Sequence, residues 1–150
     1  MSTSNSAESK AKNTILFLCT GNSCRSQMAE GWARHLRAHV IAPYSAGIEK
    51  HGLNSYAVRV MAEAGVDISD QRSKLVEELP VATFDYIITL CGHAHETCPY
   101  FPGRTIHHGF PDPAQMVKTA SSEEEILHAF RTVRDQIRFF VESLPETLPH

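Results

Sequence analysis

The sequence predicts one α/β domain arranged as a three-layer sandwich, in which a central four-stranded parallel sheet carries helices on both faces. Short, continuous apolar runs at 14–19 and 85–91 are typical of strands buried on both faces. Stretches with apolar residues at helical spacing separate the predicted strands. Strands that alternate with helices indicate a parallel sheet. The length of 150 residues is enough for one domain with a hydrophobic core.

Each element has its own signal in the sequence. Gly65 is a typical residue just past a helix end, and Ser122 with Glu125 has the spacing of a capping box before the last helix. We therefore expect, in order, a strand at 14–19, a helix at 25–40, a strand at 41–48, a helix at 55–64, a short helix at 73–79, a strand at 85–91, a short strand at 104–107 and a long helix that begins after Ser122.

Composition and the start of the chain narrow the class of protein. The net charge of −3 gives no reason to expect nucleic acid or an anionic membrane as the main partner. No apolar run is long enough to cross a bilayer, and the polar first residues lack the apolar core of a secretory signal. We expect a flexible tail at 1–12, a single domain at 13–150, a cytoplasmic location and a monomer.

The loop after the first predicted strand has the residues of an anion site. In an open α/β sheet, ligands bind at the carboxyl ends of the strands, where Cys19 is expected. Unpaired N–H groups at a helix start attract anions, and Arg25 adds a planar fork of donors that suits a tetrahedral oxyanion. Gly21 and Asn22 allow a tight turn or left-handed backbone. Ser26 is placed to donate a hydrogen bond to the cysteine sulfur.

These features predict an oxyanion held against a nucleophilic sulfur. A thiolate is stabilised at a helix N-terminus and beside an arginine, so Cys19 is the expected nucleophile for displacement at phosphorus or a similar centre. The alternative is a buried cysteine that ends a core strand, but the strand, the glycine and the following helix favour a site. The predicted oxyanion-binding residues are Thr20, Gly21, Asn22, Ser23, Cys24 and Arg25.

The segment CTGNSCRSQMAEGW resembles the active-site segment of the thioredoxin-coupled arsenate reductases, which share the low-molecular-weight tyrosine phosphatase fold. The resemblance continues through YSAGIEKHGLN, AGVDIS, IITLCGHAHETCP and GFPDPA, and it covers about residues 13–140. It implies a phosphatase-like fold, reduction of arsenate to arsenite in arsenic detoxification, no bound cofactor, and thioredoxin or a similar dithiol protein as the reductant.

The resemblance also implies a role for each site residue. Cys19 attacks arsenate bound by the loop amides and Arg25, and Asp112 protonates the departing oxygen. Cys91 then attacks Cys19, which releases arsenite and leaves a Cys19–Cys91 disulfide. Cys98 attacks Cys91 in turn, and the Cys91–Cys98 disulfide is presented to thioredoxin.

The positions of these residues in the sequence support the implied roles. Cys91 ends a predicted buried strand, so it is expected at the same edge of the sheet as Cys19. Cys98 follows in a segment rich in glycine, proline and histidine, and a mobile loop can bring sulfurs together for disulfide exchange. Asp112 precedes a proline, for which a simple turn is the alternative interpretation. Cys24 is expected to be a small loop or core residue with no essential role.

The sequence departs from the family pattern beside the loop and before the acid. Some members bind potassium there, and the matching ligands are Asn22, Glu30 and Ser45, but the fourth position carries Lys74. We expect Lys74 to take the place of the ion, to pair with Glu30 and to remove specific potassium activation. Pro111 stands where the family commonly has a first aspartate before the acid.

Two alternative functions stay open. A low-molecular-weight protein tyrosine phosphatase would hydrolyse phosphate monoesters through a phosphoenzyme on Cys19 and use Cys91 and Cys98 only for protection against oxidation. Ala114 and Gln115 stand where such phosphatases usually carry aromatic residues, which argues against a tyrosine substrate. The other alternative is a Cys/His metal-binding or arsenic-sensing module without turnover.

Histidines are frequent around the later cysteines. Their spacing does not match a standard zinc pattern, so no metal site is expected. One of them could tune the thiols near neutral pH, because histidine titrates there. The residues are His93, His95, His107 and His108.

Overall fold

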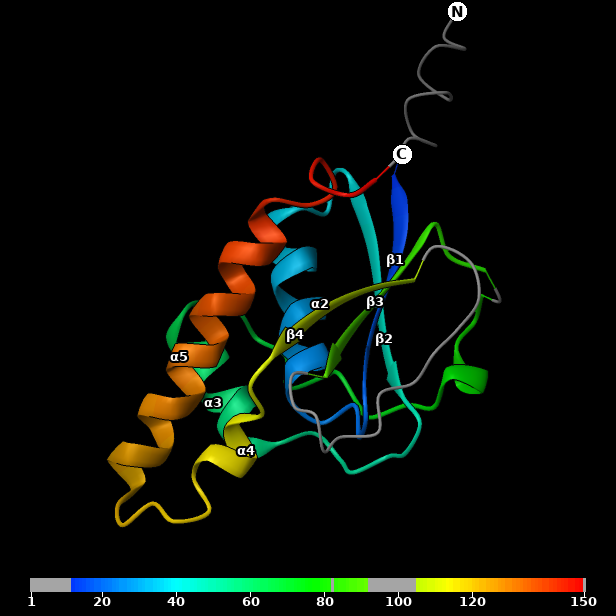
Figure 1. Ribbon diagram of the computed structural model, residues 1–150. Helices are drawn as coiled ribbons and strands as arrows, with labels where there is room; N and C mark the ends of the chain where they lie inside the picture. The colour runs from blue at the N-terminus through cyan, green and yellow to red at the C-terminus, as the bar shows by residue number, and fades with distance from the viewer. Residues whose placement is uncertain (1–11, 82, 92–104, 150) are drawn as a thin grey trace, which may run out of the picture.

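The computed structural model describes residues 12–81, 83–91 and 105–149. Within them four strands form one parallel sheet in the order β2-β1-β3-β4, as Figure 1 shows, which confirms the predicted four-stranded sheet. The strands are β1 (Asn13–Cys19), β2 (Ile41–Gly47), β3 (Tyr86–Cys91) and β4 (Thr105–Phe110). Because β2 lies on one side of β1 and β3 on the other, the chain reverses its winding direction between β1 and β3, and ligands bind at such switch points.

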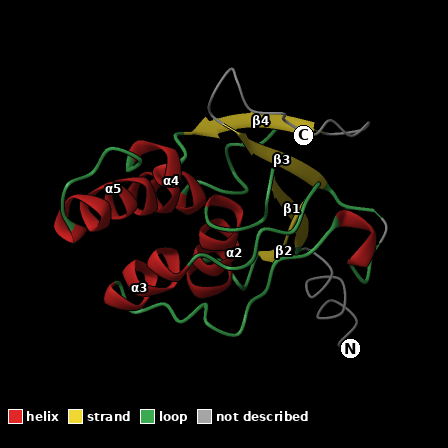
Figure 2. Ribbon diagram, turned by 90° about the horizontal axis from the view of Figure 1, so that it is seen from below, coloured by secondary structure: helices red, strands yellow, loops and turns green. Residues whose placement is uncertain are grey.

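The helices are distributed unequally over the two faces of the sheet. The four α-helices lie together on one face, and the opposite face carries only a short 3-10 helix among the described residues (Figure 2). The α-helices are α2 (Arg25–Leu36), α3 (Ser55–Glu63), α4 (Pro113–Met116) and α5 (Glu123–Glu142), and the 3-10 helix is η1 (Val76–Glu78). The sheet with helices on both faces is therefore present, with a thick and a thin outer layer.

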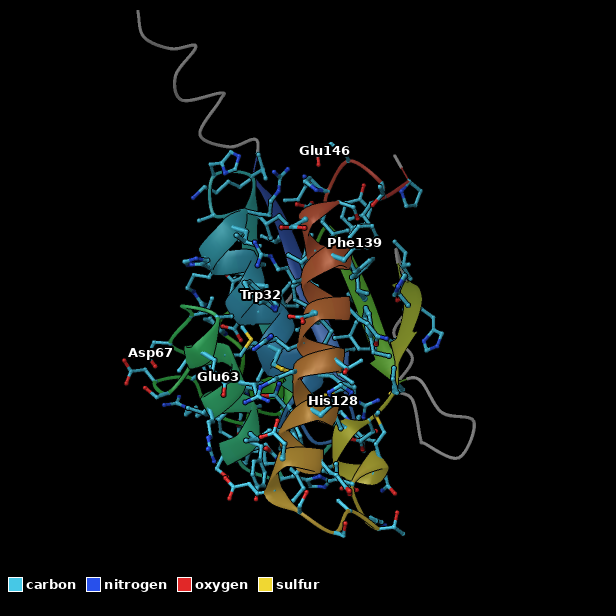
Figure 3. The ribbon with its side chains drawn as sticks, turned by 90° about the vertical axis from the view of Figure 1, so that its left-hand side faces the viewer. Trp32, Glu63, Asp67, His128, Phe139 and Glu146 are labelled. Atoms are coloured by element: carbon cyan, nitrogen blue, oxygen red, sulfur yellow. The ribbon has the colours of Figure 1, made fainter. Side chains whose placement is uncertain are left out.

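Alternation along β1 divides the core in two. Ile15 and Phe17 point into the main core under the α-helices, whereas Leu16 and Leu18 pack on the thin side with residues of the segment around η1. In the main core α2 packs against α5, and Figure 3 shows Trp32 of α2 beside that helix. The Trp32 indole N–H donates to the carbonyl oxygen of Arg134 at 3.1 Å, so this large buried ring also has its polar atom satisfied.

Two of the predicted helices differ from the structure. The helix predicted at 25–40 ends at Leu36, because the chain turns at 38–40 and Arg37 uses its side chain to bind the carbonyl oxygen of Leu144 at 2.8 Å. Val40 still packs against the core from that turn, which explains its apolar side chain. The short helix predicted at 73–79 is wrong for most of its length, because the chain there forms a bridge from Leu75 to β2 before one turn of η1.

Two further boundaries are corrected. The strand predicted at 104–107 runs on to Phe110, because it pairs with β3 as far as Cys91 across an irregularity in register. The capping box is half formed: the Ser122 hydroxyl accepts from the Glu125 N–H, but the Glu125 carboxylate accepts from Ser121 instead of Ser122. Helix α3 ends just before Gly65, as predicted.

The tail predicted at 1–12 lies outside the described residues except for Lys12, so it stays a prediction. Among the residues that the structure does describe, no helix has both the length and the apolar composition needed to cross a membrane.

Candidate active site

The predicted nucleophile and one predicted shuttle cysteine lie together at the switch point. Cys19 ends β1 and Cys91 ends the neighbouring β3, and both side chains are buried. The hydroxyl oxygen of Thr20, the first residue of the loop after β1, lies 3.8 Å from the sulfur of Cys91. The structure thus confirms that the two cysteines share one edge of the sheet.

The backbone carbonyls of the loop at 20–24 are held by a neighbouring segment. The chain between β2 and α3 runs beside the loop, and its N–H groups donate to three loop carbonyls at 3.0–3.1 Å. Carbonyls bonded outward in this way leave the loop N–H groups to face an anion. The pairs are Ile48 and Glu49 to Thr20, His51 to Gly21, and Asn54 to Ser23.

Asn22 is the central buried residue of the loop. Its φ of 48° is in the left-handed region, as predicted, while Gly21 has no positive φ. Its amide nitrogen donates to the Ser26 hydroxyl at 2.7 Å, and its amide oxygen accepts from the Lys74 N–H at 2.8 Å. Ser73 donates to the carbonyl oxygen of Asn22 at 2.6 Å. Two bonds therefore hold the Asn22 side chain and a third holds its backbone carbonyl.

The Ser26 hydroxyl links Asn22 to the nucleophile. It lies 2.9 Å from the sulfur of Cys19, which confirms the predicted contact. When Cys19 is a thiolate it can only accept, and the Ser26 hydroxyl then donates to the sulfur while it accepts from Asn22. Helix α2 starts beside the same sulfur with no side-chain cap and no acidic residue in its first turn, so its positive end faces the loop.

Arg25 and Asp112 meet above the loop. The Arg25 guanidinium is buried and donates to the carbonyl oxygens of Leu90 and Phe110 at 3.4 and 3.2 Å, which ties it to the ends of β3 and β4. Its Nη2 atom lies 3.7 Å from the Asp112 carboxylate. Asp112 also caps α4 by accepting from the Ala114 N–H at 3.0 Å. The residue predicted as the acid therefore also begins a helical turn, as the alternative interpretation expected.

A pocket of about 430 Å³ is lined by Cys19, Asp112 and most of the predicted oxyanion-binding loop, but its lining does not include Asn22, Ser26 or Cys91. Its floor is the oxyanion loop, and its walls include residues that the sequence did not single out. The lining residues are Cys19, Thr20, Gly21, Ser23, Cys24, Arg25, Ile48, Glu49, His51, Asp112, Ala114 and Gln115. The wall at Ile48–His51 follows directly after β2. Because ligands bind at the carboxyl ends of strands, this position in the sequence could have predicted that the segment lines the site.

Gly47, the last residue of β2, is a second position that sequence reasoning missed. A Cβ atom there would stand 2.7 Å from the carbonyl oxygen of Thr20 and 2.9 Å from the backbone nitrogen of Asn22. Only glycine lets β2 approach the loop this closely.

Cys24 lies in the same loop but in a different environment. It is buried, and burial is the main cause that raises the pKa of its thiol far above the ordinary value, with Cys19 and Asp112 adding to the rise. A thiol of this kind stays protonated near neutral pH. The environment is in keeping with the prediction that Cys24 has no nucleophilic role, which stays a prediction.

The predicted pairing of Lys74 with Glu30 is confirmed. The Lys74 ammonium lies 3.8 Å from the buried Glu30 carboxylate, whose other contacts are the Ser45 hydroxyl at 2.5 Å and Arg34 at 2.5 Å. Burial lowers the pKa of Lys74 below its ordinary value, an effect that the neighbouring Glu30 carboxylate partly offsets. Lys74 thus places a positive charge beside the buried Glu30, while its backbone N–H holds the Asn22 side chain.

The structure says less about Cys98 and the four predicted histidines. Cys98, His93 and His95 lie outside the described residues. The Nδ1 atom of His107 and the hydroxyl oxygen of Thr89 share a hydrogen bond of 2.8 Å. The ring of His108 stacks on that of Phe140, with ring centres 4.0 Å apart. Across the described ranges 12–81, 83–91 and 105–149, no three histidine, cysteine or acidic side chains are grouped so that they could hold a metal ion.

Comparison with known proteins agrees with this geometry. The family model described as low molecular weight phosphotyrosine protein phosphatase matches residues 14–149. The arsenate reductase of Halalkalibacterium halodurans is 46% identical over 138 residues, which span 91% of this chain and 97% of that protein. The arsenate reductase of Bacillus licheniformis is 49% identical over 139 residues, or 91% and 98% of the two chains.

Solved structures give the same result. The structure of an arsenate reductase in the phosphate binding state superposes with a TM-score of 0.72 at 34% identity and covers 91% of this chain and 99% of that one. An arsenate reductase in the reduced state gives 0.67 at 36% identity, with 88% and 95% covered. The chain therefore belongs to the low molecular weight phosphotyrosine protein phosphatase family, in the branch whose matched relatives carry the name arsenate reductase.

Proposed function

We propose that this protein reduces arsenate to arsenite with a three-cysteine relay that a thioredoxin-like dithiol protein regenerates. The observation that carries the proposal is that Cys19 and Cys91 end neighbouring strands, with the Cys91 sulfur 3.8 Å from the hydroxyl of Thr20 in the loop that follows Cys19. Hydrolysis of a phosphate ester needs one nucleophilic sulfur, whereas reduction needs a second thiol beside it. The relatives named arsenate reductase support the same assignment.

The first step is displacement at arsenic. The Cys19 thiolate bonds to arsenic of an arsenate held by the loop N–H groups and Arg25. One arsenate hydroxyl leaves as water with a proton from Asp112, and arsenic stays As(V). Ser26 orients the attacking sulfur, since its hydroxyl lies 2.9 Å away. The Asp112 carboxyl is suited to reach the leaving oxygen because it lies 3.7 Å from the Arg25 guanidinium that holds the oxyanion.

The second step transfers electrons. The Cys91 thiolate bonds to the Cys19 sulfur, the sulfur–arsenic bond breaks, and its electron pair reduces As(V) to As(III). Arsenite leaves, and the two thiols have lost two electrons to form one disulfide. Cys98 then attacks the Cys91 sulfur and frees the Cys19 thiolate. The external dithiol protein reduces the Cys91–Cys98 disulfide by the same exchange chemistry.

The test is arsenite production from arsenate with thioredoxin, thioredoxin reductase and NADPH. The wild type is expected to turn over, and the Cys91→Ser and Cys98→Ser variants are expected to stop while they still bind phosphate. A wild type that yields no arsenite but hydrolyses an aryl phosphate, with Cys91→Ser equally active, would show that the protein is a phosphatase. Turnover that survives in Cys98→Ser would remove the third cysteine from the relay.

A further inference from the structure

The wall of the pocket formed after β2 carries a hydrogen-bonded polar pair that no step of the proposed reaction uses. Glu49 and His51 both line the pocket, and the Nε2 atom of His51 lies 2.5 Å from a carboxylate oxygen of Glu49. Both side chains are about half exposed, at 60% and 52%. The pair therefore stands at the mouth of the pocket, whereas Cys19 and Arg25 lie buried at its floor.

The pair is held in place from several sides. The His51 N–H donates to the carbonyl oxygen of Gly21 at 3.1 Å, and the Glu49 N–H donates to that of Thr20 at 3.0 Å. The imidazole ring lies directly on Gly21, because a Cβ atom on that glycine would overlap the ring. The next residue, Gly52, donates from its N–H to the Ser73 hydroxyl at 3.1 Å. The ring is thus fixed against the oxyanion loop by its backbone, its glycine contact and Glu49.

The composition of the walls decides what can lie above a bound oxyanion. Among the described residues that line the pocket, none is Phe, Tyr or Trp, and the lining also includes Ala114 and Gln115. A bare tetrahedral oxyanion makes its contacts at the floor. The organic group of an ester must instead lie along the walls, where it would cover the polar pair and separate it from water without giving it a new partner. Contacts that penalise the wrong ligand in this way are a recognised source of specificity.

We propose that Glu49 and His51 are specificity residues that restrict the pocket to unsubstituted inorganic oxyanions by penalising apolar esters. This inference rests on the proposed function, since it names the substrate class of the same site. Glu49 repels any anion at long range, but the discrimination comes from the substituent, because only an ester brings apolar surface against the pair.

The test compares two ligands that differ only by the organic group, inorganic phosphate and phenylphosphonate, by calorimetric titration of the full chain. His51→Phe keeps a ring on Gly21 but loses the bond to Glu49, and Glu49→Gln keeps the shape but loses the charge. His39→Ala, in the exposed turn before β2 at the opposite end of the sheet, is the matched control. Each variant is measured beside the wild type.

The expected result is a fall of at least about threefold in the ratio of the phenylphosphonate Kd to the phosphate Kd in both pocket variants, with His39→Ala unchanged. A ratio that stays within about threefold of the wild type in both variants would overturn the proposal. Binding alone is read, so failure of the wild type to produce arsenite would contradict the proposed function without changing this result. Failure of one variant to fold leaves the other as the test.

Discussion

The oxyanion loop and the segment that carries Asp112 are held in very different ways. In the loop, Asn22 is fully buried. Bonds from Ser73 and from the segment after β2 hold the loop backbone, and a bond from Lys74 holds the Asn22 side chain. Asp112 begins a helix of four residues, its side chain is 21% exposed, and its ion pair with Arg25 is 3.7 Å long. The loop that forms the floor of the site is therefore held by many bonds, whereas the segment that carries Asp112 is held by few.

The difference matches the tasks of the two regions. Preorganised donors stabilise a developing charge only when they do not have to reorient during the reaction, so the loop must be rigid. In the proposed reaction, the acid must first reach a departing oxygen and then leave room for a second sulfur at the same centre. A short helix with few bonds can shift for that purpose. Substitutions in the two regions should therefore affect different quantities.

Asp112→Asn is expected to have the largest effect on the rate. Asparagine is as good an N-cap as aspartate, so α4 and the stability of the fold should be kept, but the proton for the leaving oxygen is lost. We expect kcat to fall by about 10²–10⁴ with little change in Tm or in the Kd for phosphate. A fall in kcat of less than about tenfold, measured in the coupled arsenite assay, would exclude Asp112 as the general acid.

Arg25→Lys is expected to reduce binding and rate together. Lysine cannot span the carbonyl oxygens of Leu90 and Phe110 and also present a planar fork to the oxyanion. We expect kcat/KM to fall by about 10²-fold, with weaker phosphate binding. Arg138→Lys, at an exposed position on α5, serves as the control for a change of arginine to lysine elsewhere. Equal phosphate Kd values for Arg25→Lys and the wild type would contradict the assigned role.

Asn22→Ala should act on stability before it acts on chemistry. Alanine loses the bonds to Ser26 and Lys74 and must also adopt a φ of 48°. We expect a loss of about 2–4 kcal/mol in the free energy of unfolding, measured by urea denaturation.

Asn22→Gly separates the two causes, because glycine loses the bonds but adopts the left-handed backbone freely. It should recover about 1 kcal/mol of the loss. If both variants are equally unstable, the backbone at this residue contributes no strain. If neither is destabilised by more than about 0.5 kcal/mol, the loop is not the rigid region described above.

Much of this contrast was predictable from the sequence. The strand ending in Cys19, the glycine and asparagine of the loop, and the arginine at the helix start are adjacent in the chain, so local rules place them together. The placement of Cys19 and Cys91 at one edge of the sheet followed from the rule that parallel strands end at the same edge. The pairing of Lys74 with Glu30 was also predicted, because it rested on a residue-by-residue comparison with the family pattern.

The parts that were missed depend on contacts between segments far apart in the sequence. Glu49 and His51 face the pocket because β2 ends next to the loop. Their place after a predicted strand was a signal for this edge of the sheet, but their residue types did not mark them as part of the site. Segment 73–79 reads as a helix by its apolar spacing, but Leu75 is used for a bridge to Gly47. The first helix ends at Leu36, where the side chain of Arg37 donates a hydrogen bond to the carbonyl oxygen of Leu144, just after α5. Tertiary contacts override local propensity in each case.

Replacement of sodium by potassium tests the rigid region more finely. Lys74 places an ammonium 3.8 Å from the Glu30 carboxylate, so the negative charge beneath the loop is already balanced. We expect kcat/KM to change by less than about twofold when 100 mM potassium chloride replaces sodium chloride, because both ions only screen a site with its own cation. A larger rise with potassium would show that an ion binds despite Lys74.

The smallest expected effect concerns the anchoring of the segment that carries the acid. His108 lies on β4, which leads to Asp112, and its ring stacks on Phe140 of α5. Burial, followed by the neighbouring His107, lowers the pKa of His108 below its ordinary value, so the folded protein favours the neutral ring. The stability that this supplies is fully present above the ordinary histidine pKa of about 6.5 and is lost as the pH falls through the lowered value. Because burial of the ring is only partial, we expect the loss in the free energy of unfolding to be a fraction of a kcal/mol. His108→Phe should keep the stacking and show a flatter dependence of the free energy of unfolding on pH below 6.5, and parallel curves for the two proteins would mean that other groups control the acid side.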